Sequence, residues 1–319
     1  MFFAQYKRLN LFPMSKQKLW SINLILLALT CIFILVASQM SNTEKPDYDW
    51  QPTENVPQIV KSVDLDKAFS FCDEALPMDN FDVRERLDRE LTVNTYWHSS
   101  TILSIKSTMR FFPVMDRILE EEGVPTDLKY IAVAESALRN AVSPAGAKGI
   151  WQFMKGTGNE YGLEINSEVD ERYHLEKATH AAAKYLKSLR QRFGSWANAA
   201  AAYNMGGGNM NKHLREQEAD NYFDLNLNEE TSRYYFRLVA IKQIMENPRE
   251  FGFYVDREDY YPALDDYRTE EVSEAVENWG AFAKEQGTSY RMLKVYNPWL
   301  IDNKLTNRSG KTYEIRVPK

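Results

Sequence analysis

A glutamate in an unusual position gives the clearest sign of chemistry in this sequence. In a helix, Leu128, Ile131 and Ala132 form one apolar stripe, and Glu135 falls on the same stripe at i+7 from the first of them. Burial of a carboxylate disfavours its ionised form and raises its pKa. A carboxyl group that keeps its proton near neutral pH is suited to general acid catalysis on a glycosidic oxygen. The alternative is a buried glutamate that a local hydrogen bond or an ion pair satisfies.

Two later segments combine small residues with side chains that bind sugars. Residues 143–154 contain Gly146 and Gly149 and end in Trp-Gln-Phe-Met, and residues 202–206 read Ala-Tyr-Asn-Met-Gly. Glycine permits close approach of the backbone to a ligand, while tyrosine, asparagine and glutamine offer hydrogen bonds and a stacking face. Each segment alone is typical of an ordinary turn or packed helix, so only their combination with Glu135 indicates a site.

Several other kinds of chemistry lack support in the sequence. The four histidines show no zinc-ligand spacing, so we expect no metal and no cofactor. Cys72 lies in an acidic stretch that disfavours a thiolate, and no G-x-S-x-G motif occurs. A formal charge of −6, from 39 basic and 45 acidic residues, argues against binding to nucleic acid.

An apolar segment near the N-terminus predicts export. Residues 24–37 carry no charged side chain, four basic residues precede them, and the small-residue exit at Val36-Ala37-Ser38 is typical of a signal peptide. Extended back to Leu19, the segment is nearly long enough for a membrane anchor, and a buried core helix is the third alternative. We therefore expect residues 1–38 to be a signal peptide or anchor, with the spanning part at 19–38. The polar, proline-containing residues that follow predict a linker over 39–65.

The middle of the chain predicts a helical domain over residues 66–250. Pro113 is placed to open one helix and Gly123 to end it. Thr126 is a candidate N-cap for the next helix, with Asp127 in its first turn.

Further along, the same local signals define three more helices. One is predicted over residues 175–193 and ends at Gly194. Ser195 is placed to cap a short alanine-rich helix that stops at residues 204–206, and a last amphipathic helix is predicted over 231–245.

The remaining residues, 251–319, predict a connector and a small second domain. Its pattern from residue 270 is strand, two short helices and strand, with the elements at 272–276, 279–285, 290–296 and 313–317. The predicted fold class is thus mainly α, with a small β-α-α-β module at the C-terminus.

Taken together, the motifs resemble the lytic transglycosylases of the soluble-transglycosylase type, glycoside hydrolase family 23. The matching elements, in chain order, are Glu135-Ser136, the G-x-x-G-x-[MW]-Q turn at 146–152, Ala-Ala-Tyr-Asn-Met-Gly at 201–206 and Glu-Thr-x-x-Tyr at 230–234. Residues 123–128, Gly-Val-Pro-Thr-Asp-Leu, further resemble the branch of the membrane-bound transglycosylase D. The likeness covers roughly residues 80–247 and implies a lysozyme-like helical catalytic domain.

The C-terminal residues resemble a lysin motif (LysM), a small peptidoglycan-binding module. The likeness rests on Phe282-Ala283-Lys284, Leu293, Asn297-Pro298 and the closing segment 313–318. The Gly-Asp-Thr turn usual after the first strand is absent, and residues 274–278 stand there instead. A glycan-binding role and a purely structural role for residues 270–319 therefore both stay open.

The family resemblance implies a substrate and a mechanism. The substrate is the glycan strand of peptidoglycan, cut at the β-1,4 bond between N-acetylmuramic acid and N-acetylglucosamine. Glu135 is implied to protonate the bridging oxygen and then, as a base, to close a 1,6-anhydro ring. The implied substrate-binding residues are Ser136, Gly149, Gln152, Met154, Tyr203, Asn204 and Tyr234, with Tyr234 also the best candidate to hold Glu135.

The resemblance also implies a location on the periplasmic side of a bacterial cell envelope, with a membrane contact through the N-terminal segment if it stays uncleaved. A hydrolase of the same fold is the first alternative; Asp170 and Glu171 could supply its second carboxylate, but we interpret them as surface charges. A non-catalytic peptidoglycan-binding protein and a wall-anchored scaffold are the others. The sequence does not indicate endo or exo action, stem-peptide preference or any protein partner.

Overall fold

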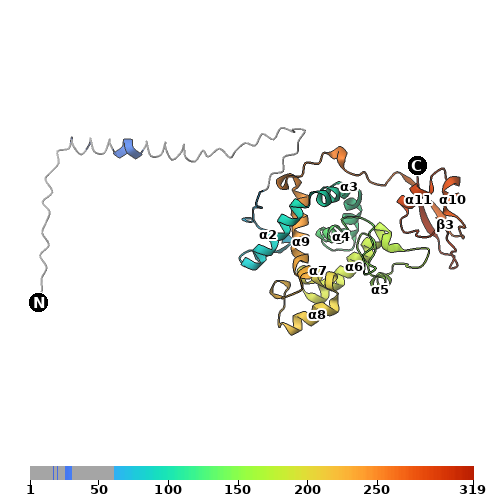
Figure 1. The fold of residues 1–319 in the computed structure, drawn as a ribbon, viewed down its shortest axis with the longest axis horizontal. Helices are drawn as coiled ribbons and strands as arrows, with labels where there is room; N and C mark the ends of the chain where they lie inside the picture. Colours follow the sequence, from blue (N-terminus) through green and yellow to red (C-terminus); the bar gives the residue numbers. More distant parts are fainter. Residues whose placement is uncertain (1–16, 18–19, 21–25, 31–60) are drawn as a thin grey trace. The chain divides into compact units, whose positions relative to one another are not determined.

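Helices dominate the part of the chain that the computed structural model describes, residues 17, 20, 26–30 and 61–319 (Figure 1). The predicted signal peptide or anchor and the linker lie mostly outside these residues. Within the described residues, no helix has the length and apolar character needed to cross a membrane. Residues 61–319 form one compact unit.

The first part of this unit is a helical domain that opens with a short hairpin of two strands with two residues each, β1 (Ser70–Phe71) and β2 (Glu74–Ala75). Its helices are α2 (Phe81–Tyr96), α3 (His98–Glu121), α4 (Lys129–Ser136), α5 (Lys155–Glu160), α6 (Leu175–Phe193), α7 (Trp196–Met205), α8 (Gly207–Glu216) and α9 (Glu229–Glu246). Helix α9 packs against α2, α4 and α7, and its apolar side chains belong to the main core. This arrangement brings side chains of α9 next to the C-terminal end of α4.

The end of α6 and the start of α7 are where the local sequence signals predicted them. Helix α6 ends at Phe193, and Gly194 follows with φ of 80°, a left-handed conformation that favours glycine. The side chain of Ser195 accepts a hydrogen bond from the N–H of Asn198 and caps α7.

Two predicted helix starts are wrong. Pro113 does not open a helix but lies inside α3. A proline in a helix interior costs about 3 kcal/mol through its missing N–H and its ring clash. Buried side chains on both sides of it, Ile105 and Met115, anchor α3 and outweigh that cost.

Thr126 is not an N-cap either. It begins a short 3-10 helix, Thr126–Leu128, which runs directly into α4 without a side-chain cap. The carboxylate of Asp127 instead accepts hydrogen bonds from the N–H of Cys72 and from Lys242 Nζ, both at 2.7 Å. A long-range contact thus replaces the local cap.

The C-terminal module contains β3 (Tyr267–Val272), α10 (Trp279–Glu285), α11 (Tyr290–Tyr296) and β4 (Tyr313–Pro318). The two strands are antiparallel, with Tyr267 opposite Pro318 and Val272 opposite Tyr313. The prediction of a mainly helical protein with a small β-α-α-β module is therefore confirmed, and both module helices have the predicted bounds. The first strand was predicted too late, at 272–276, because Val276 is apolar; it pairs instead with Leu305 in an isolated bridge.

The module is joined to the helical domain through the loop between α5 and α6. Val169 of this loop is buried in the core of the module, beside Leu300. The N–H of Asp170 donates to the carbonyl of Trp299 at 2.9 Å, and Glu168 accepts from the backbone and hydroxyl of Thr306. The loop thus has the module on one side and the helical domain on the other.

Candidate active site

Glu135 is the penultimate residue of α4, where the helix ends abruptly. Ala137 and Leu138 follow with φ of 51° and 57°, a left-handed conformation that is strained for residues other than glycine. The half-buried Glu135 carboxylate accepts a hydrogen bond of 2.6 Å from Tyr234 Oη on α9.

The electrostatic environment of Glu135 favours its protonated form. Burial raises the pKa of Glu135, and the charge of Glu230 raises it further. The hydrogen bond from Tyr234 and the charge of Arg237 lower the pKa, but burial outweighs both, so the net shift is upward. Such a carboxyl group is available as a general acid at a higher pH than an exposed glutamate.

Two buried or partly buried tyrosines stay neutral beside this carboxylate. Burial raises the pKa values of Tyr203 and Tyr234 well above their ordinary range, and the nearby Glu135 charge adds to both shifts. Tyr203 Oη donates to the carbonyl of Trp151 at 2.6 Å. Both hydroxyls are therefore proton donors, one to the carboxylate and one to the turn that follows α4.

The turn after α4 depends on Gly149. Its φ is 81°, and a Cβ built there would lie 1.9 Å from the carbonyl oxygen of Arg172, so no other residue fits without rearrangement. The amide of Gln152 donates to the carbonyls of Ala141 and Gly149 at 3.1 and 2.7 Å. In this structure Gln152 therefore closes the turn on itself, and Met154 projects half-exposed at its end.

Ser136 and Asn204 also make contacts within the protein. The buried Ser136 hydroxyl contacts the carbonyls of Ile150 and Ala132 at 2.9 and 3.1 Å, which ties the turn to the end of α4. Asn204 Oδ1 accepts from the hydroxyl of Thr231 at 2.9 Å. Of the predicted site residues, Tyr234 contacts the Glu135 carboxylate directly, while Ser136, Gln152, Tyr203 and Asn204 hold the turn and the helix ends through contacts within the protein.

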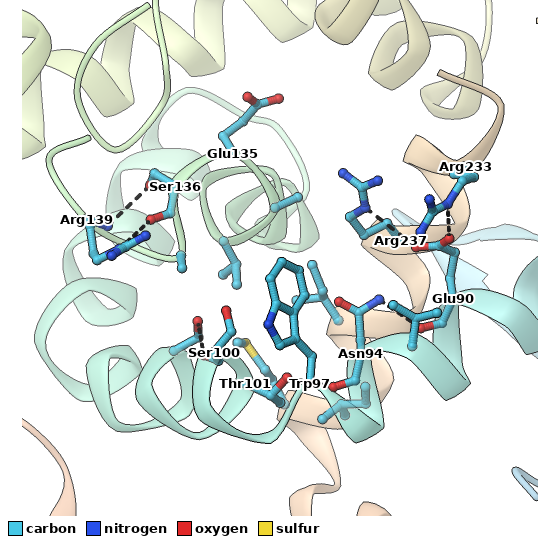
Figure 2. A pocket seen from close by; sticks show the side chains of 18 of the residues that line it. Glu90, Asn94, Trp97, Ser100, Thr101, Glu135, Ser136, Arg139, Arg233 and Arg237 are labelled. Carbon is cyan, nitrogen blue, oxygen red and sulfur yellow. Dashed lines mark hydrogen bonds and ion pairs between the residues drawn. The ribbon is translucent and has the colours of Figure 1, made fainter. Parts of the chain in front are cut away.

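A pocket of about 520 Å³ lies against Glu135 (Figure 2). It is lined by the C-terminal end of α2, the first turns of α3, the C-terminal end of α4 and residues of α9. Of the predicted site residues only Glu135 and Ser136 line it. The other polar or aromatic lining residues include Glu90, Asn94, Trp97, Ser100, Thr101, Arg139, Glu230, Arg233 and Arg237. Sequence reasoning named Glu230 only as part of a family motif and missed the others, because no glycine or proline marks the break between α2 and α3 at Trp97.

A network of charges forms one wall of the pocket. The fully buried carboxylate of Glu90 lies 2.5 Å from Arg233 Nε and 3.5 Å from Arg237 Nε. Arg237 also pairs with Glu230 at 3.1 Å. These pairs satisfy charges that would be costly to bury alone.

Asp170 and Glu171 are not surface charges, contrary to the sequence-based interpretation, because both are almost fully buried. Arg172 binds Asp170 through Nε and Nη2 at 2.8 and 2.7 Å, and Lys177 pairs with Glu171. Burial raises the pKa of each carboxyl group, but hydrogen bonds and charges from these partners outweigh it and leave both pKa values below the ordinary range. Two such ionised, paired carboxylates are structural in this loop.

Metal-binding groups do not gather at this site. In the residues described by the structure, no set of three or more His, Cys, Asp or Glu side chains is placed to hold a metal ion.

Comparison with known proteins identifies the class of both parts. Residues 116–226 match the family model described as the transglycosylase SLT domain, and residues 268–319 match the soluble lytic transglycosylase C-terminal LysM-like domain. The chain therefore contains an SLT domain, followed by a LysM-like domain. Glu135 and the turn after α4 lie within the matched SLT residues, whereas Tyr234 and the pocket residues on α2 and α9 lie outside them.

Individual relatives agree with these domains. Two proteins called membrane-bound lytic murein transglycosylase D, from two strains of Escherichia coli, are each 30% identical to this chain over 250 residues. The match covers 76% of this chain and 52% of each relative, so the chain spans about half the length of these homologues.

Solved structures also resemble this chain. Two of them are an inactive mutant of the lytic transglycosylase Slt from Pseudomonas aeruginosa and the 70 kDa soluble lytic transglycosylase from Escherichia coli. Each aligns over 48% of this chain and 26% of its own, with a TM-score of 0.37 and identities of 21% and 20%.

Proposed function

We propose that this protein is a lytic transglycosylase of peptidoglycan in which Glu135 acts first as the acid and then as the base. The observation that carries the proposal is the half-buried Glu135 carboxyl group, with its raised pKa and its hydrogen bond from Tyr234, beside a pocket in an SLT domain. The names of the homologous transglycosylases support the same activity.

The first step breaks the β-1,4 bond between N-acetylmuramic acid and N-acetylglucosamine. Glu135 gives its proton to the bridging oxygen, and the bond from that oxygen to C1 of the muramic acid breaks. The proton leaves with the N-acetylglucosamine as its 4-hydroxyl group. Tyr234 then donates to a full carboxylate, an interaction that favours the ionised form.

The second step restores the enzyme without water. The 6-hydroxyl of the muramic acid attacks its own C1, and Glu135 takes the hydroxyl proton, which closes the 1,6-anhydro ring. One carboxylate therefore serves both steps and ends the cycle protonated.

The charges around Glu135 support a mechanism with one carboxylate. Most glycoside hydrolases use a second carboxylate, either as the base that activates water or as the nucleophile. Among the described residues that line the pocket, the other two carboxylates, Glu90 and Glu230, are paired with arginines. The buried Asp170 and Glu171 are held by Arg172 and Lys177 and do not line the pocket.

We further propose that the protein works in the bacterial cell envelope, on the periplasmic side, with residues 19–38 as signal or anchor. The proposal is supported by the name of the homologues, which describes them as membrane-bound. Glycan binding by residues 270–319 is a separate hypothesis. It is tested by measuring whether this module binds purified cell wall.

The proposal is tested by mass spectrometry of purified peptidoglycan after digestion by the full-length protein. We expect products with 1,6-anhydro ends, lighter by one water than hydrolysis products, from the unaltered protein and from a Glu121→Gln control at an exposed site. Glu135→Gln is expected to give none. Reducing ends that depend on Glu135 would show a hydrolase instead, and binding without cleavage would show a non-catalytic binder.

A further inference from the structure

Trp97 is presented to solvent in the pocket from a fixed position. It lies between α2 and α3, and its side chain is 62% exposed. The backbone around it is held, because Trp97 N–H donates to the carbonyl of Val93 and its own carbonyl accepts from the N–H of Thr101, at 3.0 and 3.1 Å. Figure 2 shows the indole projecting into the pocket from this junction. A large, exposed and well-anchored aromatic ring is suited to bind a flat apolar surface of a ligand.

Arg139 is the arginine in this pocket that has no carboxylate partner among the described residues. Its Nε donates weakly to the carbonyl of Ser136 at 3.4 Å, and the side chain is exposed. The two other arginines of the pocket, Arg233 and Arg237, are paired with glutamates. Figure 2 shows Arg139 on the side of Trp97 opposite to these two arginines. An uncommitted guanidinium group at this edge is available to an anion, and its fork geometry fits a carboxylate.

Glu90 belongs to the paired charges on the side of Trp97 opposite to Arg139 (Figure 2). Its Oε2 atom is buried and makes no hydrogen bond, although Arg237 lies 3.5 Å away. This oxygen has almost no accessible surface, so its charge is balanced by the two arginines and not by a ligand.

We propose that the space between Trp97 and Arg139 is a second sugar subsite that recognises a muramic acid unit together with its carboxylate. The pyranose ring stacks on the indole, and the acid carried by the lactyl substituent pairs with Arg139. This inference rests on the proposed function. It says which unit of the glycan strand binds on the side of the pocket formed by Trp97 and Arg139. The Glu135 carboxylate is directed away from Trp97 in Figure 2, so the stacked sugar is a further unit of the strand and not the unit being cleaved.

Two parts of a strand can supply the carboxylate. In a strand without stem peptides the lactyl group itself carries a free acid, whereas in a strand with stems that acid is amidated and the peptide supplies its own carboxylates. Oligomers of N-acetylglucosamine offer similar rings without any carboxylate. These three ligands therefore separate stacking from charge recognition and distinguish the two sources of charge.

The test measures binding by the full-length Glu135→Gln protein, which leaves the ligands uncut. Trp97→Ala and Arg139→Gln are added singly, with Arg117→Gln as a matched control on the exposed face of α3, where Arg117 pairs with Glu121. The probes are stem-free and stem-bearing oligomers of the peptidoglycan disaccharide and N-acetylglucosamine oligomers of equal length. Calorimetric titration at two salt concentrations gives the affinities, and thermal melts establish that each variant is folded.

We expect Trp97→Ala to weaken all three ligands about tenfold, the size of one lost stacking contact. Arg139→Gln is expected to weaken only the charged oligomers, also about tenfold at low salt and less at high salt. A loss for stem-free oligomers identifies the lactyl acid, and a loss confined to stem-bearing oligomers identifies the peptide acids. In active protein, both changes should raise KM while kcat is kept.

The inference fails if folded Trp97→Ala and Arg139→Gln proteins bind and cleave like the unaltered protein. It also fails if Arg139→Gln weakens N-acetylglucosamine oligomers as much as charged ones. The proposed function is tested separately by the 1,6-anhydro products. Normal products with unchanged affinities overturn the subsite alone, and the absence of products overturns the activity alone, since the binding is measured without cleavage.

Discussion

Arg172 offers the sharpest test of how the loop between α5 and α6 supports the candidate site. Its side chain is 4% exposed and bridges two parts of the molecule. On one side it binds Asp170, whose N–H donates to the module through Trp299. On the other side its Nη1 donates to the carbonyls of Gly146 and Phe153, at 3.2 and 3.1 Å, in the turn that follows α4.

The expected cost of Arg172→Met follows from what the substitution leaves behind. Asp170, 1% exposed, would lose both guanidinium contacts and keep only the backbone N–H of residue 172 at 3.3 Å and Lys148 at 3.6 Å, and the two turn carbonyls would lose a donor. Removing one partner of a buried ion pair costs about 3–5 kcal/mol of the free energy of unfolding. For a domain of this size that corresponds to a melting temperature lower by roughly 10 °C.

The pH dependence of stability tests the same pair. Burial raises the pKa of Asp170, but the hydrogen bonds and charge of Arg172 outweigh it and hold the pKa below its usual value. The stabilisation by this pair is therefore present above the ordinary aspartate pKa of roughly 4 and is lost as the pH falls through the lower, folded-state pKa. The deficit of Arg172→Met should accordingly be largest near neutral pH and shrink in acid.

Chemical denaturation of the unaltered protein, Arg172→Met, Asp170→Asn and the double variant measures these effects. The double variant is expected to lose less than the sum of the single losses, because neither charge is then left alone. Activity below the melting temperature should also fall, since the turn that carries Gln152 loses its support. A loss below about 1 kcal/mol for Arg172→Met, or strictly additive losses, would refute a buried, coupled pair.

Three further predictions, with four substitutions, test other parts of the molecule. Tyr234→Phe removes a hydrogen bond that lowers the pKa of Glu135, so the alkaline limb of the pH–rate profile of strand cleavage should move to higher pH; an unmoved limb would contradict the assignment. Gly149→Ala should prevent stable folding, because its Cβ would clash with a backbone carbonyl, whereas Gly146→Ala, with φ of 87° and open space, should cost only about 1–2 kcal/mol in thermal melts; equal losses would refute the close approach. Leu300→Ala, at the contact between module and loop, should cost about 2–5 kcal/mol in denaturation, and an unchanged midpoint would show that this contact contributes no stability.

The hydrogen bond between Tyr234 and Glu135 was predicted from sequence motifs, whereas other contacts near the site were not. The sequence placed both residues in motifs and selected Tyr234 as the best candidate to hold the acid, and the structure has this contact at 2.6 Å. The sequence could not show that Gln152 and Ser136 use their polar groups on backbone carbonyls. Those contacts depend on how the turn folds back on α4, and no periodicity encodes that.

What the sequence determined by itself is local. Periodicity and caps gave α6, the Ser195 cap of α7 and both module helices, and they placed Glu135 on the buried stripe of α4. These features depend on residues within a few positions of one another, whose hydrogen bonds and spacing can be read directly from the chain.

Only the tertiary structure decided the rest. It kept Pro113 inside α3, buried Asp170 beside Arg172 and assembled the pocket around Trp97. The ion pair between Glu90 and Arg233 joins residues 143 positions apart. Contacts of this kind outweigh local preferences because the desolvation and packing of a buried group depend on every element around it, and the sequence near that group does not reveal which elements those are.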